Sequence, residues 1–423
     1  MQILQPLRTG AIARLWTGLA LSAVGDQLQR MAIIWLSLQL LGAHAGFVTA
    51  AESAVAIVVA LFAGGLTDRW DHRRTMLAVD LLRAVVALVP VGAAAAGCLG
   101  AWALVSSALG LAALRMVFEP ALHASLPRLA PERQRLAATN ALMDATSRLA
   151  RLLGPSLAGL LAAALPVVSL MGVDAASFLV SAGALASLSR DLPVLPAAAP
   201  RSRTELLLAG VRAVRRQPAF AALMALSGVT SGLWVLAMWL CLPLVIQGRH
   251  IAGFGLDGLG VLGLVMGSYG VGNVAGNLWV SALPLRRPVS MILLGDAIVG
   301  VGLLAMACVC AWAPPGHVAA LLMLAAGATA VGGPLSDVPW ATMRQTAFEP
   351  HEIAAVHRLA MVSEWGGVLL ATSLGPFVLA GHPPALTMQL CATVVIAVVL
   401  IGYLARSTAR SWTPLPRCPQ PAR

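Results

Sequence analysis

Charged residues are scarce in this sequence. Only 11% of the 423 residues are charged and 59% are hydrophobic, with a mean hydropathy of +0.85. Ordinary soluble domains carry about 25% charged residues. Lysine is absent altogether, since all 28 basic residues are arginines. This composition excludes a soluble globular protein.

Patterns for catalysis or metal binding are equally sparse. No nucleotide-binding loop, nucleophile elbow or metal-ligand spacing is present. The six cysteines are scattered and five of them lie in apolar segments, so we expect small buried side chains rather than a disulfide or a metal site: Cys98, Cys241, Cys308, Cys310, Cys391 and Cys418. We therefore expect no enzyme, no cofactor and no metal.

Long apolar runs dominate what is present. They are continuous rather than alternating, and a hydrocarbon core excludes open strands, so they predict transmembrane helices and not a barrel. Twelve such segments can be marked, at roughly 14–40, 46–66, 75–98, 101–124, 138–164, 167–189, 219–246, 256–282, 289–312, 317–342, 357–380 and 384–405. The predicted fold class is an all-α polytopic membrane protein.

The arginines predict the topology. If both termini lie in the cytoplasm, all the loop and terminal arginines except Arg249 fall on the inner side, as the positive-inside rule requires. This distribution explains the net charge of +11 without nucleic acid as a partner. We expect a multi-pass protein of the bacterial inner membrane, in contact with the lipid bilayer and monomeric.

The chain divides into two six-helix halves. The longest connection, Asp191–Pro218, begins Pro/Ala-rich and continues as Thr204–Gln217, either a short amphipathic helix at the inner surface or a plain linker. The predicted domains are a bundle at 1–190, a linker at 191–218, a second bundle at 219–406 and a cytoplasmic tail at 407–423.

The two halves resemble each other in sequence. Pro120-Ala121 after the fourth segment corresponds to Pro339-Trp340 after the tenth, and Gly154-Pro155 in the fifth corresponds to Gly375-Pro376 in the eleventh. Each Gly-Pro pair predicts a hinge or a tight helix interface, the first extended by Gly159. Two parallel, pseudo-symmetric repeats of this kind form transporters with a central site.

Ionisable residues inside the spans need a partner, a wet cavity or a function. Asp26 lies near the middle of the first segment and Arg30 follows four residues later, on the same helix face. Burial favours a protonated Asp26 and Arg30 favours an ionised one, so this carboxyl could carry a coupling proton. A structural ion pair with Arg30 and direct contact with substrate are the alternatives.

Other polar residues in the spans are weaker candidates. Glu52, near the outer end of the second segment, is expected at the mouth or gate. Glu364 is a second candidate for coupling, or for a contact with the charged loop described next. Asn273 and Asn277, four apart, give the eighth segment a polar stripe that faces a cavity or a neighbouring helix.

The stretch Gly64–Arg83 carries a cluster of charges between two apolar segments. Such a loop can hold the chain on one side of the membrane or fasten one helix to another. Because other arginines suffice for topology, we expect a cytoplasmic gate in which Asp68 and Arg69 reach charged pairs on the fourth and fifth segments, or the start of the eleventh. The expected gate residues are Asp68, Arg69, Arg73, Arg74, Arg115, Glu119, Asp144 and Arg148.

These motifs resemble the major facilitator superfamily over essentially the whole chain. The loop departs from the commonest form at Asp71 and His72 and is similar to the subgroup of macrolide-type efflux proteins and the enterobactin exporter. Further elements shared with that subgroup are Gly25-Asp26, Asp80-Leu81-Leu82-Arg83-Ala84, Glu119-Pro120-Ala121, Leu126-Pro127, Asn140-Ala141-Leu142 and Leu153-Gly154-Pro155. The fifth segment resembles the antiporter motif but has Leu160 where that motif has a second glycine.

The resemblance implies a secondary transporter that exports bulky amphipathic small molecules, of drug or siderophore type, by alternating access in exchange for protons. The alternative within the same fold is a transporter for uptake or for lysophospholipid translocation. A membrane-embedded enzyme or a non-transporting sensor has no supporting motif.

Overall fold

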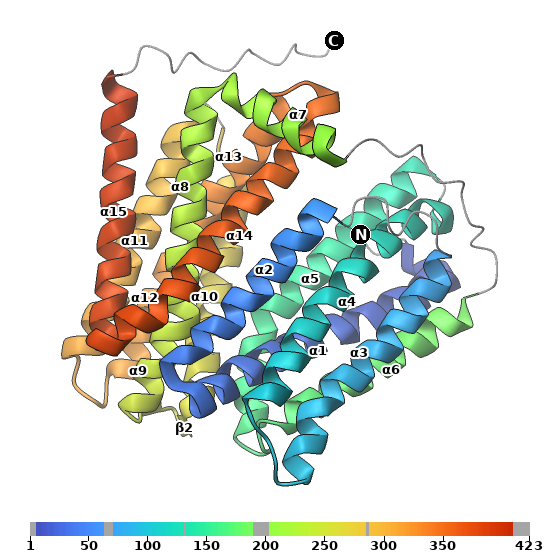
Figure 1. Ribbon diagram of the computed structural model, residues 1–423, viewed down its shortest axis with the longest axis horizontal. Coiled ribbons are helices and arrows are strands. Elements are labelled where there is room, and N and C mark those ends of the chain that lie inside the picture. Colours follow the sequence, from blue (N-terminus) through green and yellow to red (C-terminus); the bar gives the residue numbers. More distant parts are fainter. Residues whose placement is uncertain (1–5, 63–70, 131, 189–202, 285–286, 409–423) are drawn as a thin grey trace. The chain divides into compact units, whose positions relative to one another are not determined.

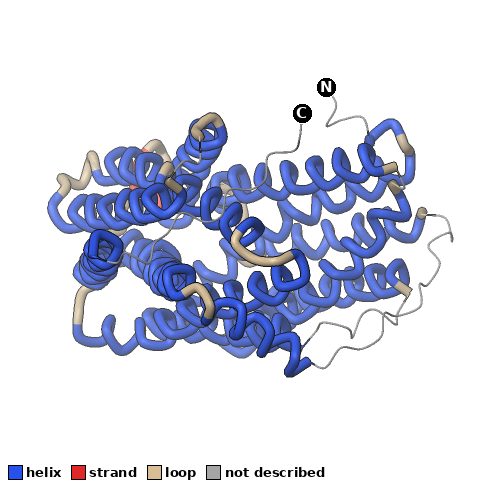
Figure 2. The backbone as a smooth tube through the Cα atoms, turned by 90° about the horizontal axis from the view of Figure 1, so that it is seen from above, coloured by secondary structure: helices blue, strands red, loops and turns tan. Residues whose placement is uncertain are grey.

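The computed structural model describes residues 6–62, 71–130, 132–188, 203–284 and 287–408, and these are almost entirely helical (Figures 1 and 2). The first helices are α1 (Gly10–Leu41), the 3-10 turn η2 (Gly42–Ala45), α2 (Gly46–Phe62), α3 (His72–Ala95), α4 (Ala101–Leu129), α5 (Arg133–Ala162), α6 (Ser169–Ser187) and α7 (Arg203–Arg215). The others are α8 (Pro218–Val235), the π-helix η4 (Leu236–Cys241), α9 (Leu242–Gly248), α10 (Gly258–Ser281), α11 (Pro288–Trp312), α12 (Val318–Ala330), α13 (Gly332–Thr346), α14 (Pro350–Gly381) and α15 (Pro384–Thr408).

The predicted all-α membrane fold is confirmed. Ten stretches of the described chain are helical, long and apolar enough to cross a membrane, and α1 and α2 together form one of them. Helix α5 is outside that set because charged residues are frequent along it. Each of the twelve predicted segments nevertheless overlaps a helix of the described chain or a run of successive helices, such as α8–η4–α9, or α12 and α13 with the turn residue Val331 between them.

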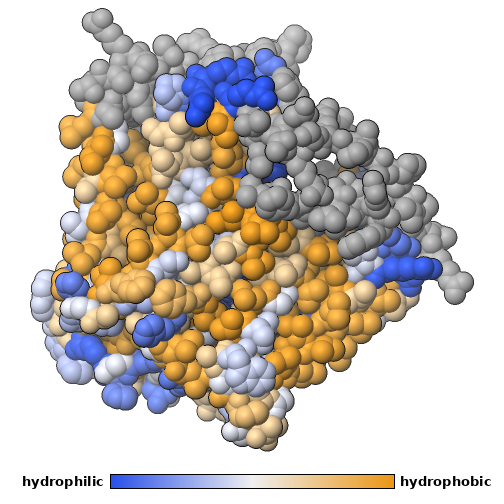
Figure 3. Space-filling model, in the orientation of Figure 1, coloured by the Kyte–Doolittle hydropathy of each residue, from blue (hydrophilic) through white to orange (hydrophobic). Residues whose placement is uncertain are grey.

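The outer surfaces of the helices suit a hydrocarbon environment. Large apolar side chains are exposed along their length, among them Trp312 at 76%, Leu278 at 70% and Phe377 at 70%. Apolar residues cover much of the visible face (Figure 3). In water such continuous exposure would be unfavourable, whereas in a bilayer these side chains contact lipid.

The chain forms two compact units. Unit 1 contains Met1–Pro200 and Arg249–Gly267, and unit 2 contains Arg201–Gly248 and Ser268–Arg423. In unit 1, α1 packs on α5 and α6, and α3 packs on α4 and α6. In unit 2, α8 packs on α14, and α11 packs on α13 and α15 (Figure 1).

This packing repeats in part between the units. The first and fifth spans of each half pair as α1–α5 and α8–α14, and the third and sixth pair as α3–α6 and α11–α15. The unit boundaries differ from the predicted ranges 1–190 and 219–406 in one segment. Arg249–Gly267, which includes the start of α10, clusters with unit 1.

Helix α7 occupies the predicted amphipathic segment and is part of unit 2. Val214 is buried among residues that include Val356 of α14, and a Cβ at Gly210 would lie 2.7 Å from a backbone oxygen of α14. Beyond its end, Arg216 forms an ion pair with Glu352, and Gln217 Nε2 donates to the carbonyl of Ala347 at 2.7 Å. The C-terminal part of α7, from Gly210 to Val214, is therefore packed against α14.

A short hairpin precedes α10. Strands β1 (Ala252–Gly253) and β2 (Leu256–Asp257) pair antiparallel, with Ala252 opposite Asp257. The two connecting residues, Phe254 and Gly255, both have positive φ, 56° and 76°. This is the geometry of the two-residue turns that suit the twist of a hairpin.

The predicted Gly-Pro sites lie at tight helix interfaces. Helix α5 continues through Pro155 as one element. A Cβ on Gly154 would lie 2.3 Å from Cβ of Gln27 in α1, and one on Gly159 would lie 3.0 Å from the carbonyl of Gly260 in α10. In unit 2, α14 likewise continues through Pro376, and a Cβ on Gly375 would lie 2.5 Å from Cδ1 of Leu236.

We expect Gly154→Ala to destabilise the protein by about 1–3 kcal/mol, because the added methyl group forces α1 and α5 apart. Gly183→Ala is the matched control, since a Cβ at that position of α6 meets nothing within 4 Å. The measurement is the midpoint of thermal unfolding of both variants in detergent. Equal midpoints for the two variants would contradict the close α1–α5 packing.

Candidate functional site

Asp26 of α1 and Arg115 of α4 form an ion pair inside the spans of unit 1. Arg115 Nη2 lies 3.2 Å from Asp26 Oδ2, and its Nε lies 3.3 Å from Glu119 Oε1. The Asp26 side chain is 25% exposed and that of Arg115 is 37% exposed. The pair joins two helices and remains partly accessible.

Two further charged residues surround this pair. Arg30 interacts electrostatically with Asp26, Glu52 and Arg115, and Glu52 of α2 interacts with both arginines. We call Asp26, Arg30, Glu52, Arg115 and Glu119 the α1–α4 charge cluster. It contains three carboxylates and two guanidinium groups, and Arg151 of α5 also interacts electrostatically with Arg30 and Arg115.

This arrangement differs from the expected pairing in two ways. The ion pair of Asp26 is formed with Arg115, whereas sequence spacing indicated Arg30, four residues away on the same helix. Arg115, expected at the cytoplasmic gate, belongs to the same cluster as Asp26. Spacing along one helix does not show which residue of another helix contacts Asp26, so the sequence could not identify the Asp26–Arg115 pair.

The charged pairs expected on the fourth and fifth segments, each made of two residues four apart, are both present. Arg115 with Glu119 has just been described, and Arg148 Nε lies 2.8 Å from Asp144 Oδ2 within α5. Both side chains of the α5 pair are more than half exposed. Exposed pairs four residues apart contribute only about 0.3–0.5 kcal/mol to stability.

The charged loop can be described only in part, because Asp68 and Arg69 lie outside the described residues. At the start of α3, Asp71 Oδ1 accepts a hydrogen bond from the backbone N–H of Arg74 at 3.0 Å and so caps the helix. Arg74 Nε also lies 3.8 Å from the Asp71 carboxylate.

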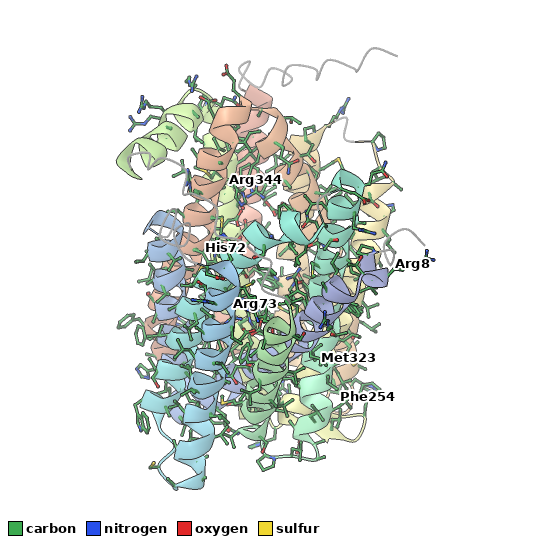
Figure 4. The ribbon with its side chains drawn as sticks, turned by 90° about the vertical axis from the view of Figure 1, so that its right-hand side faces the viewer. Arg8, His72, Arg73, Phe254, Met323 and Arg344 are labelled. Atoms are coloured by element: carbon green, nitrogen blue, oxygen red, sulfur yellow. The ribbon has the colours of Figure 1, made fainter. Side chains whose placement is uncertain are left out.

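Arg73 fastens the start of α3 (Figure 4) to the end of α6. It donates to the carbonyl of Leu185 at 3.0 Å and to that of Ala186 at 2.6 Å. Arg14 of α1 donates to the next carbonyl, that of Ser187, at 3.0 Å. Arginines at a helix C-terminus satisfy free carbonyls and complement the helix dipole. Arg73 and Arg14 therefore hold three helices of unit 1 together, a role that the sequence did not reveal.

Three more charged residues lie wholly inside unit 1. Asp80 and Asp174 are 0% exposed and Arg83 is 4% exposed. Arg83 Nη1 lies 3.5 Å from Asp80 Oδ1, and its guanidinium stacks over the rings of Phe118 at 4.6 Å and Phe178 at 5.3 Å. The sequence marked these charges as intramembrane, but only the fold shows that α3 and α6 bring them together.

Unit 2 has its own charged contact around Glu364 of α14. Trp340 Nε1 donates to Glu364 Oε1 at 3.3 Å, and Arg344 Nη1 lies 3.8 Å from the same oxygen. Arg344 also stacks 5.5 Å from the Trp340 ring (Figure 4 labels Arg344). Glu364 thus links α14 to α13, while its expected contact with the charged loop involves residues outside those described.

The asparagine stripe of α10 is bonded within its own helix. Asn277 Nδ2 donates to the backbone oxygen of Asn273 at 3.0 Å and to its Oδ1 at 3.1 Å. One turn earlier, Tyr269 lies against Trp234 with ring centroids 5.6 Å apart. Tyr269, Asn273 and Asn277 therefore form one amphipathic side of α10, and all three side chains are partly exposed.

Among the described residues, no group of three or more histidine, cysteine, aspartate or glutamate side chains could hold a metal ion. The carboxylates of the charge cluster can bind and release protons, and its guanidinium groups can contact an anionic ligand.

Comparisons with solved structures identify the fold. The chain aligns with a peptide transporter POT in complex with sulfate at a TM-score of 0.72, 13% identity and 94% coverage of both chains. It aligns with a mutant of the nucleoside transporter NupG at 0.69, 14% identity, and 96% and 98% coverage. A bacterial homologue of the iron transporter ferroportin gives 0.67, 16% identity, and 93% and 97% coverage. Identities this low show the fold alone.

Sequence comparison identifies the family. An uncharacterised MFS-type transporter, YfiS of Bacillus subtilis (strain 168), is 27% identical over 206 residues. That match spans 47% of this chain and 48% of the relative, so the chain covers about half the length of the curated protein it matches. The profile of the transmembrane secretion effectors matches residues 1–348. The chain thus belongs to this transporter family of the major facilitator type.

Proposed function

We propose that this protein exports bulky amphipathic small molecules across the bacterial inner membrane in exchange for protons. The observation that carries the proposal is the partly exposed Asp26–Arg115 ion pair at 3.2 Å inside the spans of unit 1. The family description, transmembrane secretion effector, supports the outward direction. Both termini would lie in the cytoplasm, as the arginine distribution predicts.

The charges of the α1–α4 charge cluster explain how exchange could work. With Asp26 ionised, Arg115 has two carboxylate partners, Asp26 and Glu119. Protonation of Asp26 breaks the ion pair that joins α1 to α4 and leaves Arg115 paired only with Glu119 of its own helix. Because isolated charges inside a membrane are costly, protonation and the conformation of unit 1 are energetically linked.

The proposed class of substrate is inferred from residues of unit 2. The side of α10 formed by Tyr269, Asn273 and Asn277 offers an aromatic ring and carboxamides, which suit a molecule that is apolar with a few hydrogen-bonding groups. Asp68 and Arg69 remain our proposed residues for closing the cytoplasmic side. Arg73 and Arg74 would position that loop through the contacts described above.

We expect Asp26→Asn to abolish efflux driven by a pH gradient, because asparagine keeps the size of the side chain but cannot bind a proton. The assay uses everted membrane vesicles and a compound selected from a growth-inhibition panel of macrolides, ethidium and catecholate siderophores. Asp257→Asn, which removes an exposed carboxylate of the hairpin, is the control and should transport normally. Unchanged pH-driven efflux by Asp26→Asn would exclude Asp26 as the coupling group.

A double-mutant cycle tests whether Asp26 and Arg115 act as one unit. We expect Arg115→Gln and Asp26→Asn each to lower the midpoint of thermal unfolding in detergent, and Asp26→Asn/Arg115→Gln to be no less stable than either single variant, because each substitution already removes the pair. Losses of stability that add in the double variant would show that the two residues act independently.

A further inference from the structure

The three charges buried in unit 1 do not balance. Asp80, Arg83 and Asp174 are almost completely inaccessible, and two carboxylates with one guanidinium would leave one uncompensated negative charge. An unpaired buried charge is far more costly than a protonated carboxyl. One of the two acids therefore holds a proton when Arg83 is charged.

The contacts indicate which acid is neutral. Arg83 pairs with Asp80 at 3.5 Å. Asp174 Oδ1 instead lies 3.1 Å from Ser177 Oγ, a hydroxyl that also donates to the Asp174 backbone carbonyl at 2.7 Å. The second oxygen of each acid, Asp80 Oδ2 and Asp174 Oδ2, has no hydrogen-bond partner among the described residues, so the partner of the first oxygen is what distinguishes them. A hydroxyl group compensates a negative charge less well than a guanidinium does. The proton is therefore placed on Asp174.

Asp174 also lies beside the α1–α4 charge cluster. It touches the α1 backbone at the residue before Asp26, since a Cβ on Gly25 would lie only 2.4 Å from Asp174 Oδ1. Asp174 interacts electrostatically with Asp26 and Arg115 as well as with Arg83. Only glycine at position 25 permits this approach.

We propose that Asp174 is a second proton-binding residue of the transport cycle and that it shares one proton with Asp26. With Asp26 ionised and paired to Arg115, the proton sits on Asp174. When the O–H bond of Asp174 breaks, the proton forms an O–H bond on Asp26, and the new carboxylate of Asp174 faces the released charge of Arg115. This role rests on the proposed proton exchange and adds a carboxyl to it.

Among the described residues, three charged groups interact electrostatically with Asp174. Helix α1 contributes Asp26, α3 contributes Arg83 and α4 contributes Arg115; Asp80 of α3 lies beside Arg83. Asp174 is the one ionisable residue of α6. Helix α5 also contacts α6, and its charged residues in the spans are exposed: Asp144, Arg148 and Arg151.

Infrared spectroscopy of the purified protein tests the proposal without transport. The wild-type minus Asp174→Asn difference spectrum at neutral pH should contain the carbonyl band of a protonated carboxyl. The wild-type minus Asp257→Asn difference should lack it. In an Asp80→Asn background, substitution of Asp174 should remove no such band, because Asp174 then ionises as the partner of Arg83. Absence of the band from the first difference spectrum would overturn the proposal.

Coupling to Asp26 gives a second test. In an Asp26→Asn background the Asp174 band should disappear at lower pH than in the wild type, because Asp174 loses a negative neighbour while the positive charge of Arg115 remains. An unchanged titration would contradict proton sharing. If Asp174→Asn does not fold, Gly25→Ala is the alternative variant, because the added methyl group crowds the Asp174 carboxyl. This substitution should shift the Asp174 band. An unshifted band would count against the proposal.

The two proposals fail separately. A missing band together with loss of efflux in Asp26→Asn overturns the inference about Asp174 and supports the proposed function. A present band together with unchanged efflux in Asp26→Asn overturns the proposed function, and with it the role of Asp174 in transport.

Discussion

The free-energy cost of a charge in hydrocarbon is the constraint on which this structure depends. Each ionisable residue inside a span has to be neutralised by a partner or by a proton. In unit 1 that requirement produces the Asp26–Arg115 pair, which joins α1 to α4, and the buried Asp80–Arg83 contact within α3. In unit 2 it produces the contact of Glu364 with Arg344, which joins α14 to α13. The same contacts that hold helices together are the ones that a proton can break.

The proposed mechanism uses a difference in accessibility between the two groups of charges in unit 1. The Asp26–Arg115 pair of the α1–α4 charge cluster is partly exposed. The charges of α3 and α6 are closed off by packing, and Gly25 allows Asp174 to lie against α1 beside Asp26. In this proposal, a proton that binds an accessible carboxyl changes the electrostatics of the interior, and unit 1 would couple protonation to conformation in this way.

The fold could be predicted because apolar runs and arginines obey simple physical rules. The lengths of the continuous apolar segments predicted the all-α membrane fold, and the pairs Arg115–Glu119 and Asp144–Arg148 followed from helical spacing. The orientation predicted from the arginines remains a prediction. Contacts between helices could not be predicted, because they depend on how helices rotate against one another. That is why the partner of Asp26, the capping of α6 by Arg73 and the approach of Asp174 to Gly25 emerged only from the structure.

The central claim is that Asp26 carries the proton exchanged for substrate, and the most direct measurement is proton movement itself. Liposomes that contain the purified protein and an entrapped pH-sensitive dye receive ethidium, or whichever compound the growth panel selects, on one side. The wild type should move protons against the direction of the compound. Asp26→Asn should let the compound equilibrate with no change in the internal pH. Equal proton movement by the wild type and by Asp26→Asn would contradict the claim.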